Sequence, residues 1–205
     1  MAKVLIQFAH PILSKSRIHA RLLSYCSSLK NVTVNDLYEQ YPDLYINVDR
    51  EQRLLLSHDI IVFQHPFYWY SGPAIVKQWF DLVLEHNWAY GSRGQALAGK
   101  SMMNAISCGG SQQAYSPTGT NRFTINQFLA PFDQTAHLCK MTYLPPFVIH
   151  ATHRLTDEQL NAYGDQYCAV LSALANDQFT ADALSSVQDI NEFVTESQNE
   201  ASNER

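Results

Sequence analysis

The chain alternates short apolar runs with segments in which apolar residues recur at helical spacing, and this alternation constrains its fold most. The apolar runs, each predicted as a buried strand, are residues 3–9, 32–37, 59–64, 101–107 and 144–149. Predicted helices follow them, beginning near Ile18, Asp49, Pro73, Asn126 and Thr156, and both Asp49 with Gln52 and Thr156 with Gln159 have capping-box spacing. Such alternation favours one parallel sheet with helices on both faces, in a doubly wound α/β arrangement.

Length and composition match a single domain with a substantial core. The chain has 205 residues, of which 46% are apolar and 16% are charged. We expect residues 1–180 to form this domain. The tail, residues 181–205, is polar overall, but Leu184, Val187, Ile190 and Phe193 recur every third residue, so a short helix and a disordered segment are both open for it.

The charge and the cysteines limit which binding partners and which cellular compartment we expect for the protein. The formal net charge is −5 and no block of Lys or Arg stands out, so we expect no nucleic-acid partner. No apolar segment suits a signal peptide or a membrane span. Four cysteines without CxxC spacing favour free thiols over a disulfide or a metal site, which fits a cytoplasmic protein.

Three strand ends carry unusual sequence, after Ala9, Gln64 and Ser107. The carboxyl ends of the strands are where an open parallel sheet binds its ligands, near the point at which the strand order reverses. The agreement of the three loops therefore predicts one ligand site at this edge. The chain has neither GxGxxG nor a P-loop pattern, which disfavours a dinucleotide fold or a P-loop nucleotide site.

The first of these loops, residues 10–17, runs into a predicted helix. The N–H groups and the positive dipole end of a helix N-terminus stabilise a phosphate, and Ser14, Ser16 and Lys15 or Arg17 add donors and charge. The alternative is that Ser14 or Ser16 only caps the helix.

The second loop, residues 64–73, reads QHPFYWYSGP. Its aromatic residues stand at a strand end where core packing does not require them, and a flat isoalloxazine ring binds well against aromatic side chains. A subunit interface or simple loop packing is the alternative.

The third loop begins at Ser107 and contains Gly109 and Gly110. Two glycines let the backbone approach a ligand closely and direct N–H groups at it, for example at the polar edge of a flavin. The alternative is an ordinary turn.

A longer series of motifs connects these loops. It consists of AHP at 9–11 with Ser16 beyond, DLYEQYPD at 36–43, IIVFQHPFYWYSGP at 60–73, WAYG at 88–91, GG at 109–110 and LPPF at 144–147. Over residues 3 to about 174 the chain thus resembles the flavodoxin-like NAD(P)H dehydrogenase (quinone) family, and within it the Kef-type ancillary flavoproteins of potassium-efflux systems. The resemblance implies a flavodoxin-like fold with a five-stranded parallel sheet.

The resemblance also implies an enzyme. Members use FMN, or FAD in the larger animal enzymes, take hydride from NAD(P)H and then pass both electrons to a quinone in a ping-pong cycle. They are homodimers, so we expect Trp88 and Tyr90 near a subunit interface. Kef-type members dock on a potassium efflux antiporter, which would place the protein at the inner face of the membrane.

Site residues follow from the resemblance position by position. Those expected at the flavin phosphate and ribityl chain are His10, Ser16, Arg17, Ile18 and His19; those along the ring are Phe67, Tyr68, Trp69 and Tyr70; those at its pyrimidine edge are Ser107, Cys108, Gly109 and Gly110. Tyr115 and Asn121 fall at the positions of a catalytic Tyr and His of the animal enzymes. No metal is implied.

Three of these positions depart from the family pattern. His19 stands where relatives commonly have Asn, which predicts altered contacts on the phosphate side. Asn121 stands where the animal enzymes have His, and an amide cannot exchange a proton near neutral pH. Cys108 replaces a frequent Thr, which removes a hydroxyl donor and adds a thiol that oxidation could reach.

Two other functions stay open. The chain could act mainly as a regulatory subunit of a potassium efflux antiporter, or as an electron-carrier flavodoxin, although such carriers lack the WAYG and LPPF segments. For the remaining histidines we expect structural roles: His65 packs locally at a strand end, and His150 with His153 lacks a third metal ligand.

Overall fold

A parallel sheet forms the centre of the protein in the computed structural model, which describes residues 1–26, 28–179, 184 and 187–193. Its strands are β1 (Val4–Phe8), β2 (Val32–Asp36), β3 (Ile60–Pro66), β4 (Ser101–Ser107), β5 (Thr142–Tyr143) and β6 (Phe147–Ile149). The order is β2-β1-β3-β4-β5, and β6 also pairs with β4. Every pairing is parallel, as predicted.

The last predicted strand differs from the expectation. Of residues 144–149 only Phe147–Ile149 form a strand, β6, which pairs with the end of β4, whereas β5, which the sequence did not predict, pairs with the start of β4. Pro145 and Pro146 lie between these two short strands and carry no N–H for the ladder, so the chain leaves the sheet at this point.

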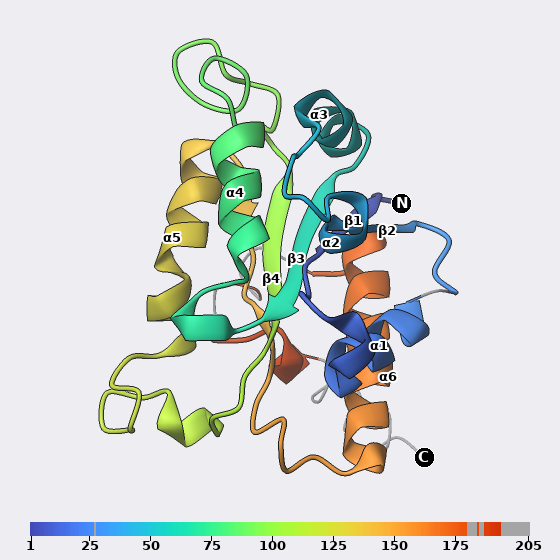
Figure 1. Ribbon diagram of the computed structural model, residues 1–205, viewed down its shortest axis with the longest axis vertical. Coiled ribbons are helices and arrows are strands. Elements are labelled where there is room, and N and C mark those ends of the chain that lie inside the picture. The colour runs from blue at the N-terminus through green and yellow to red at the C-terminus, as the bar shows by residue number, and fades with distance from the viewer. Residues whose placement is uncertain (27, 180–183, 185–186, 194–205) are drawn as a thin grey trace.

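Helices cover both faces of the sheet (Figure 1). One face carries α1 (Arg17–Cys26) and α6 (Asp157–Ala175), and the other carries α3 (Val48–Leu56), α4 (Ala74–Val83) and α5 (Ile125–Leu138). Short helical segments complete the set, namely α2 (Leu37–Gln40), η1 (Leu13–Lys15), η2 (Tyr68–Tyr70) and η3 (Gln112–Ala114).

The helix caps predicted from the sequence are confirmed only in part. The capping box of Thr156 with Gln159 begins α6 as predicted, and an equivalent pair, Thr124 with Gln127, begins α5. The predicted cap at Asp49 is wrong. Asn47 caps α3 through a hydrogen bond from the Arg50 N–H, and an amide oxygen satisfies this donor as well as a carboxylate does.

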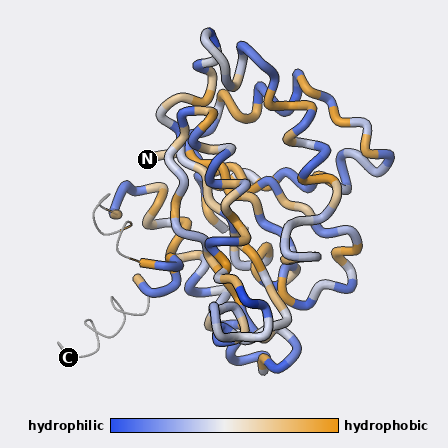
Figure 2. Tube along the Cα trace, turned by 90° about the vertical axis from the view of Figure 1, so that its left-hand side faces the viewer, coloured by the Kyte–Doolittle hydropathy of each residue, from blue (hydrophilic) through white to orange (hydrophobic). Residues whose placement is uncertain are grey.

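Alternate side chains of the central strands enter two separate hydrophobic cores. In β1, Leu5 faces α3, α4 and α5, whereas Val4, Ile6 and Phe8 face α1 and α6. The hydrophobic residues concentrate along the strands in the middle of the molecule (Figure 2). Burial on both faces explains why these strands read as continuous apolar runs.

The described part of the C-terminal segment, residues 187–193, lies against β6 and α6. Ile190 is fully buried and donates its N–H to the Pro146 carbonyl, while Asn191 Oδ1 accepts from the Val148 N–H at 2.8 Å. Part of the predicted tail thus packs on the domain. The prediction for 180–183, 185–186 and 194–205 concerns residues outside the described ones.

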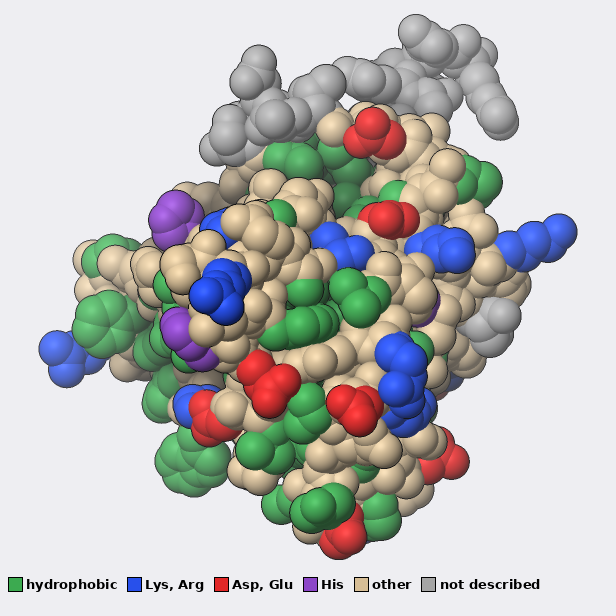
Figure 3. All heavy atoms as spheres, turned by 90° about the horizontal axis from the view of Figure 1, so that it is seen from above, with side chains coloured by type: hydrophobic (Ala, Val, Ile, Leu, Met, Phe, Trp, Pro, Cys, Tyr) green, Lys and Arg blue, Asp and Glu red, His purple; other side chains and the backbone are tan. Residues whose placement is uncertain are grey.

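Surface charge is mixed on the side away from the carboxyl ends of the strands, where acidic and basic side chains alternate (Figure 3). Within the described ranges, none of the helices combines the length and apolar character required to cross a bilayer. In the same ranges no three potential metal ligands gather, and Cys26, Cys108, Cys139 and Cys168 are all free.

Candidate functional site

Three loops meet at the carboxyl edge of the sheet, as the sequence predicts. Because β1 and β3 are neighbours and so are β3 and β4, the register sets Phe8 beside Gln64 and Pro66 beside Ser107. The loops after β1, β3 and β4 therefore lie together, at the lower edge in Figure 1. After β1 the chain continues to β2 on one side of the pair, and after β3 it continues to β4 on the other side, so the strand order reverses between β1 and β3. Doubly wound sheets bind their ligands at this position.

In the first loop, polar side chains hold the turn that begins α1. Ser16 Oγ accepts a hydrogen bond from the His19 N–H at 3.1 Å, so Ser16 caps the helix, which was the alternative reading of this position. His10 Nδ1 accepts from the Ile12 N–H at 3.2 Å. The hydroxyl proton of Ser16 stays available to a ligand at the helix N-terminus.

Arg17 points away from this site. Its guanidinium donates to the Leu155 carbonyl, and its Nε lies 3.4 Å from Asp157 Oδ1 at the start of α6. The side chain of Ile18 is buried in the core. At positions 17 and 18, therefore, the backbone N–H groups face the candidate site at the start of α1, and the side chains do not.

His19 connects the first loop to the ends of β3 and β4 through hydrogen bonds. Its ring is buried, with Nε2 2.8 Å from Ser107 Oγ and Nδ1 3.3 Å from Gln64 Nε2. An amide nitrogen only donates, so Nδ1 accepts and Nε2–H donates to Ser107. Burial holds the pKa of His19 well below its usual value, with smaller contributions from His10 and His65, and the ring is neutral at physiological pH.

Gln64 and Tyr167 complete this chain of hydrogen bonds, and the sequence analysis did not single them out. The Tyr167 hydroxyl donates to Gln64 Oε1 at 3.1 Å, in the buried core. A glutamine at the end of an otherwise apolar strand was the available signal for Gln64. Nothing local marks Tyr167, which looks like any aromatic residue on the inner face of α6.

The second loop, residues 64–73, which we call the aromatic loop, exposes side chains that do not pack in the core. Phe67 is buried, but Trp69 is 93% exposed, and Tyr68 and Tyr70 are about half exposed. Trp69 and Tyr70 have φ values of 51° and 63°, a conformation that non-glycine residues rarely adopt. Tyr70 also stacks on Phe128, with centroids 4.9 Å apart. Such a loop is suited to a flat ligand or to another protein surface.

His65 packs locally, as predicted. It is fully buried, its ring stacks on Phe132 with a centroid separation of 5.7 Å, and Nδ1 donates to the Pro66 carbonyl at 3.0 Å. A Cβ on Gly72 would come within 3.2 Å of this ring. The small residue at 72 therefore lets the aromatic loop lie against His65.

The third loop brings the two predicted catalytic residues together. A Cβ on Gly110 would lie 2.9 Å from the Tyr115 ring and 3.3 Å from Asn121 Nδ2, so both side chains contact this glycine. Asn121 Oδ1 accepts a hydrogen bond from the Tyr70 hydroxyl at 3.4 Å. Tyr115 and Asn121 thus lie between the second and third loops.

Cys108 is buried beside His150, a residue that the sequence analysis considered only as a metal ligand. The Cys108 Sγ lies 3.2 Å from His150 Nδ1. Burial raises the pKa of Cys108 to about 12, so the thiol keeps its proton and is a poor nucleophile. This argues against the predicted sensitivity to oxidation.

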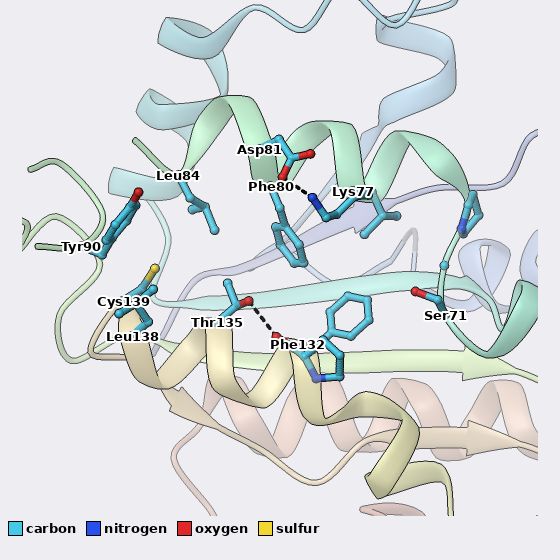
Figure 4. Close-up of a pocket in the computed structure, with 14 residues that line it drawn as sticks. Ser71, Lys77, Phe80, Asp81, Leu84, Tyr90, Phe132, Thr135, Leu138 and Cys139 are labelled. Carbon is cyan, nitrogen blue, oxygen red and sulfur yellow. Dashed lines mark hydrogen bonds and ion pairs between the residues drawn. The ribbon is translucent and has the colours of Figure 1, made fainter. Parts of the chain in front are cut away.

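A groove between α4 and α5 begins at the aromatic loop (Figure 4). It encloses about 400 Å3, and Ser71, Gly72 and Pro73 line its end nearest the site. Phe80 and Phe132 lie at its base with ring centroids 5.5 Å apart, and Tyr90 lines its other end. Trp88 and Tyr90, which we expect near a subunit interface, are half-buried against the α4–α5 core.

The sheet order, the ligand edge and the exposed aromatic loop together define a protein of the flavodoxin-like class. The chain belongs to the Flavodoxin_2 family, described as having the flavodoxin-like fold, whose family model matches residues 2–171.

Two curated relatives are similar over most of their length. The glutathione-regulated potassium-efflux system ancillary protein KefG of Pectobacterium carotovorum is 43% identical over 80% of this chain and 91% of that protein. The uncharacterized NAD(P)H oxidoreductase YdeQ of Bacillus subtilis is 42% identical over 80% of this chain and 84% of that protein.

Solved structures superpose closely as well. General stress protein 14 of Treponema denticola, in complex with FMN, has a TM-score of 0.79 and 37% identity over 84% of this chain and 99% of that one. An NADPH-quinone reductase of P. pentosaceus has a TM-score of 0.76 and 32% identity over 84% and 97%. A chain described as a tryptophan halogenase of Streptomycin violaceusniger has a TM-score of 0.78 and 39% identity over 80% and 95%. Fold likeness alone therefore does not determine the reaction.

Proposed function

We propose that this protein is a flavin-dependent NAD(P)H:quinone oxidoreductase that binds FMN at the carboxyl edge of the sheet. The observation that carries the proposal is the convergence of three loops there, one of which exposes Tyr68, Trp69 and Tyr70. An exposed aromatic surface beside a helix N-terminus and a glycine pair matches the three parts of FMN, which are its ring, its phosphate and its polar ring edge.

The residues present fit FMN without rearrangement of the core. The free N–H groups at the start of α1 and the Ser16 hydroxyl would hold the phosphate, with His10 beside them. The aromatic loop would lie along the ring, and backbone groups of Gly109 and Gly110 would face its pyrimidine edge. Bound flavin would supply the chemistry that accepts hydride from NAD(P)H and returns it to an acceptor, while the protein orients it and excludes water.

The relatives support this choice of cofactor and reaction. The Treponema denticola protein was crystallised with FMN, and the P. pentosaceus protein is described as an NADPH-quinone reductase. FAD is the alternative cofactor, and identification of the flavin released on denaturation distinguishes it from FMN.

The test is direct. The purified protein should be yellow, should release FMN on denaturation, and should bleach within seconds when NADPH is added without oxygen, with recovery of colour on adding a quinone. A colourless protein that neither FMN nor FAD reconstitutes would contradict flavin binding. A yellow protein that NADPH does not bleach would contradict the reductase function and favour an electron carrier that depends on a protein partner.

We also propose that the protein works as a homodimer through the α4–α5 groove. The groove is continuous with the aromatic loop, and Leu82 and Leu138 expose apolar surface on α4 and α5. A second copy in this position would cover each flavin site. Sedimentation should give a dimer, and Leu138→Glu should dissociate it and weaken FMN binding; a wild-type monomer at working concentration would contradict this arrangement.

A second candidate function is regulation of a potassium efflux antiporter, with the protein at the cytoplasmic face of the membrane. The likeness to KefG over 91% of that protein favours it. In cells that lack the gene, potassium efflux should fall. Rescue by a variant that binds no flavin would make regulation the main role, whereas rescue by flavin-competent protein alone would favour catalysis.

A further inference from the structure

Three side chains lie together at the end of β4. The Cys108 Sγ lies 3.2 Å from His150 Nδ1, and the Cys108 thiol lies close enough to the Tyr115 phenol to contribute to the raised pKa of Tyr115. The Tyr115 and His150 rings also lie close together, with centroids 5.9 Å apart. The thiol thus joins a phenol in the candidate site to an imidazole on the loop after β6.

The three groups differ in how readily they exchange protons. Burial raises the pKa of both Tyr115 and Cys108 to about 12, so each keeps its proton at neutral pH. Burial also lowers the pKa of His150, while a hydrogen bond to the Gly110 backbone opposes this effect. An unperturbed imidazole titrates near pH 6.5, so even with a lowered pKa His150 is the member of the series that exchanges protons most readily near neutral pH. Asn121, which like Tyr115 lies against Gly110, has only an amide.

Cavities connect His150 to solvent. One, of about 30 Å3, is lined by Tyr115, His150 and Asp189, and is large enough for about two water molecules at ~15 Å3 each. The other, of about 500 Å3, is lined by His150 together with Tyr163 of α6 and the acidic residues Asp189 and Glu192. Burial and then Glu192 raise the pKa of Asp189 to about 6.

We propose that His150, acting through Cys108 and Tyr115, delivers the proton that accompanies hydride transfer to the quinone. The inference rests on the proposed function. Reduction of a quinone to a hydroquinone by NAD(P)H consumes one proton from solution. Protonated His150 passes its Nδ1 proton to the Cys108 sulfur, the thiol proton moves to the Tyr115 oxygen, and the phenolic proton goes to the acceptor oxygen. His150 then recovers a proton from solvent, and Cys108 and Tyr115 end as they began.

Variants of two residues test the path in the FMN-loaded protein. His150→Gln and Cys108→Val should each slow quinone turnover about 100-fold and flatten its pH profile between pH 5 and 8, the size expected of general acid catalysis. Cys108→Thr retains a hydroxyl between Tyr115 and His150 and should keep most of the rate. Asn121→His in the His150→Gln background should restore part of the turnover, because it returns an imidazole to the group of side chains around Gly110. His137→Gln, on the exposed side of α5, is the control and should change nothing.

A second readout needs no flavin. In flavin-free protein, NMR titration of the His150 imidazole should change when Cys108 becomes Val and change less when it becomes Thr. An unchanged titration in Cys108→Val, or normal turnover and pH profile in His150→Gln protein that binds FMN, overturns the proton path. Failure of the proposed function is distinct, because then the wild-type protein itself does not bleach with NADPH or does not turn over quinone.

Discussion

Asn104 donates a hydrogen bond from its side-chain amide to Nε2 of His65, 3.1 Å away, in the middle of the sheet. The direction is determined because His65 Nδ1 faces the Pro66 carbonyl, which only accepts. The imidazole is therefore neutral with its proton on Nδ1. On the other side of this pair, the Tyr143 hydroxyl donates to Asn104 Oδ1 at 2.7 Å. This series joins β3, β4 and β5 directly behind the aromatic loop.

The neutral His65 makes stability fall in acid. Burial lowers its pKa from 6.5 to about 4 in the folded protein, so between these values the unfolded chain binds the extra proton. The free energy of unfolding should decrease by about 3 kcal/mol as the pH falls through this window. Above pH 6.5, His65 should cause no change in it with pH. Urea denaturation at pH 7.5 and 4.5 measures the loss. His65→Gln should show a smaller loss, and an equal loss would contradict the assignment.

Glu51 should be among the most sensitive positions for stability. Its carboxylate is fully buried and accepts hydrogen bonds from Gln7, Asn35, Tyr41, Arg50 and Trp79. Glu51→Gln replaces an acceptor oxygen by an NH2 group that faces these donors, and should lower the free energy of unfolding by about 3 kcal/mol. Tyr41→Phe removes one donor only and should cost about 1 kcal/mol. Guanidinium denaturation compares the free energies of unfolding of the two variants. Equal losses would show that the carboxylate contributes no more to stability than one of its donors does.

Gly164→Ala should destabilise the protein although alanine favours helices. A Cβ at this position would lie 2.8 Å from the Tyr25 ring, where α6 packs against α1. Overpacking typically costs about 1–3 kcal/mol, more than the ~1 kcal/mol gained in helix propensity. The thermal midpoint should fall in Gly164→Ala and should rise when the same change is made in a Tyr25→Ala background. Stabilisation by the single substitution would mean that the ring moves aside freely.

Trp69→Ala should weaken FMN binding without affecting folding. The side chain is 93% exposed, so its removal should change the free energy of unfolding by less than about 0.5 kcal/mol. Loss of an aromatic contact with the flavin ring should raise the dissociation constant of FMN about tenfold, as measured by fluorescence titration. Tyr45→Ala, a change at another exposed aromatic residue, is the control and should leave FMN affinity unchanged. Unaltered affinity in Trp69→Ala would place the ring site elsewhere.

The sequence predicts the strands and the ligand edge well because both depend on local patterns. Strands β1, β3 and β4 are short apolar runs; His10 and Cys108 lie just beyond the ends of β1 and β4, while β3 continues through His65 to Pro66, two residues past its predicted end. The capping box at Thr156 is also local, since a side chain and an N–H three residues away decide it. The interruption between β5 and β6 was foreseeable from the prolines.

The contacts that give the site its character were not predictable in this way. Arg17 has the sequence position of a phosphate ligand, yet α6 packs beside α1 and offers the Leu155 carbonyl and Asp157 instead. His19 meets Ser107 across 88 residues, and Cys108 meets His150 across 42. The sequence alone determined most of the strand segments and the edge of the sheet at which their loops meet, because apolar periodicity and turn residues act over a few positions. Only the tertiary structure decided which side chains touch, because the register of β1, β3, β4 and β6 and the packing of α1 on α6 bring distant residues together.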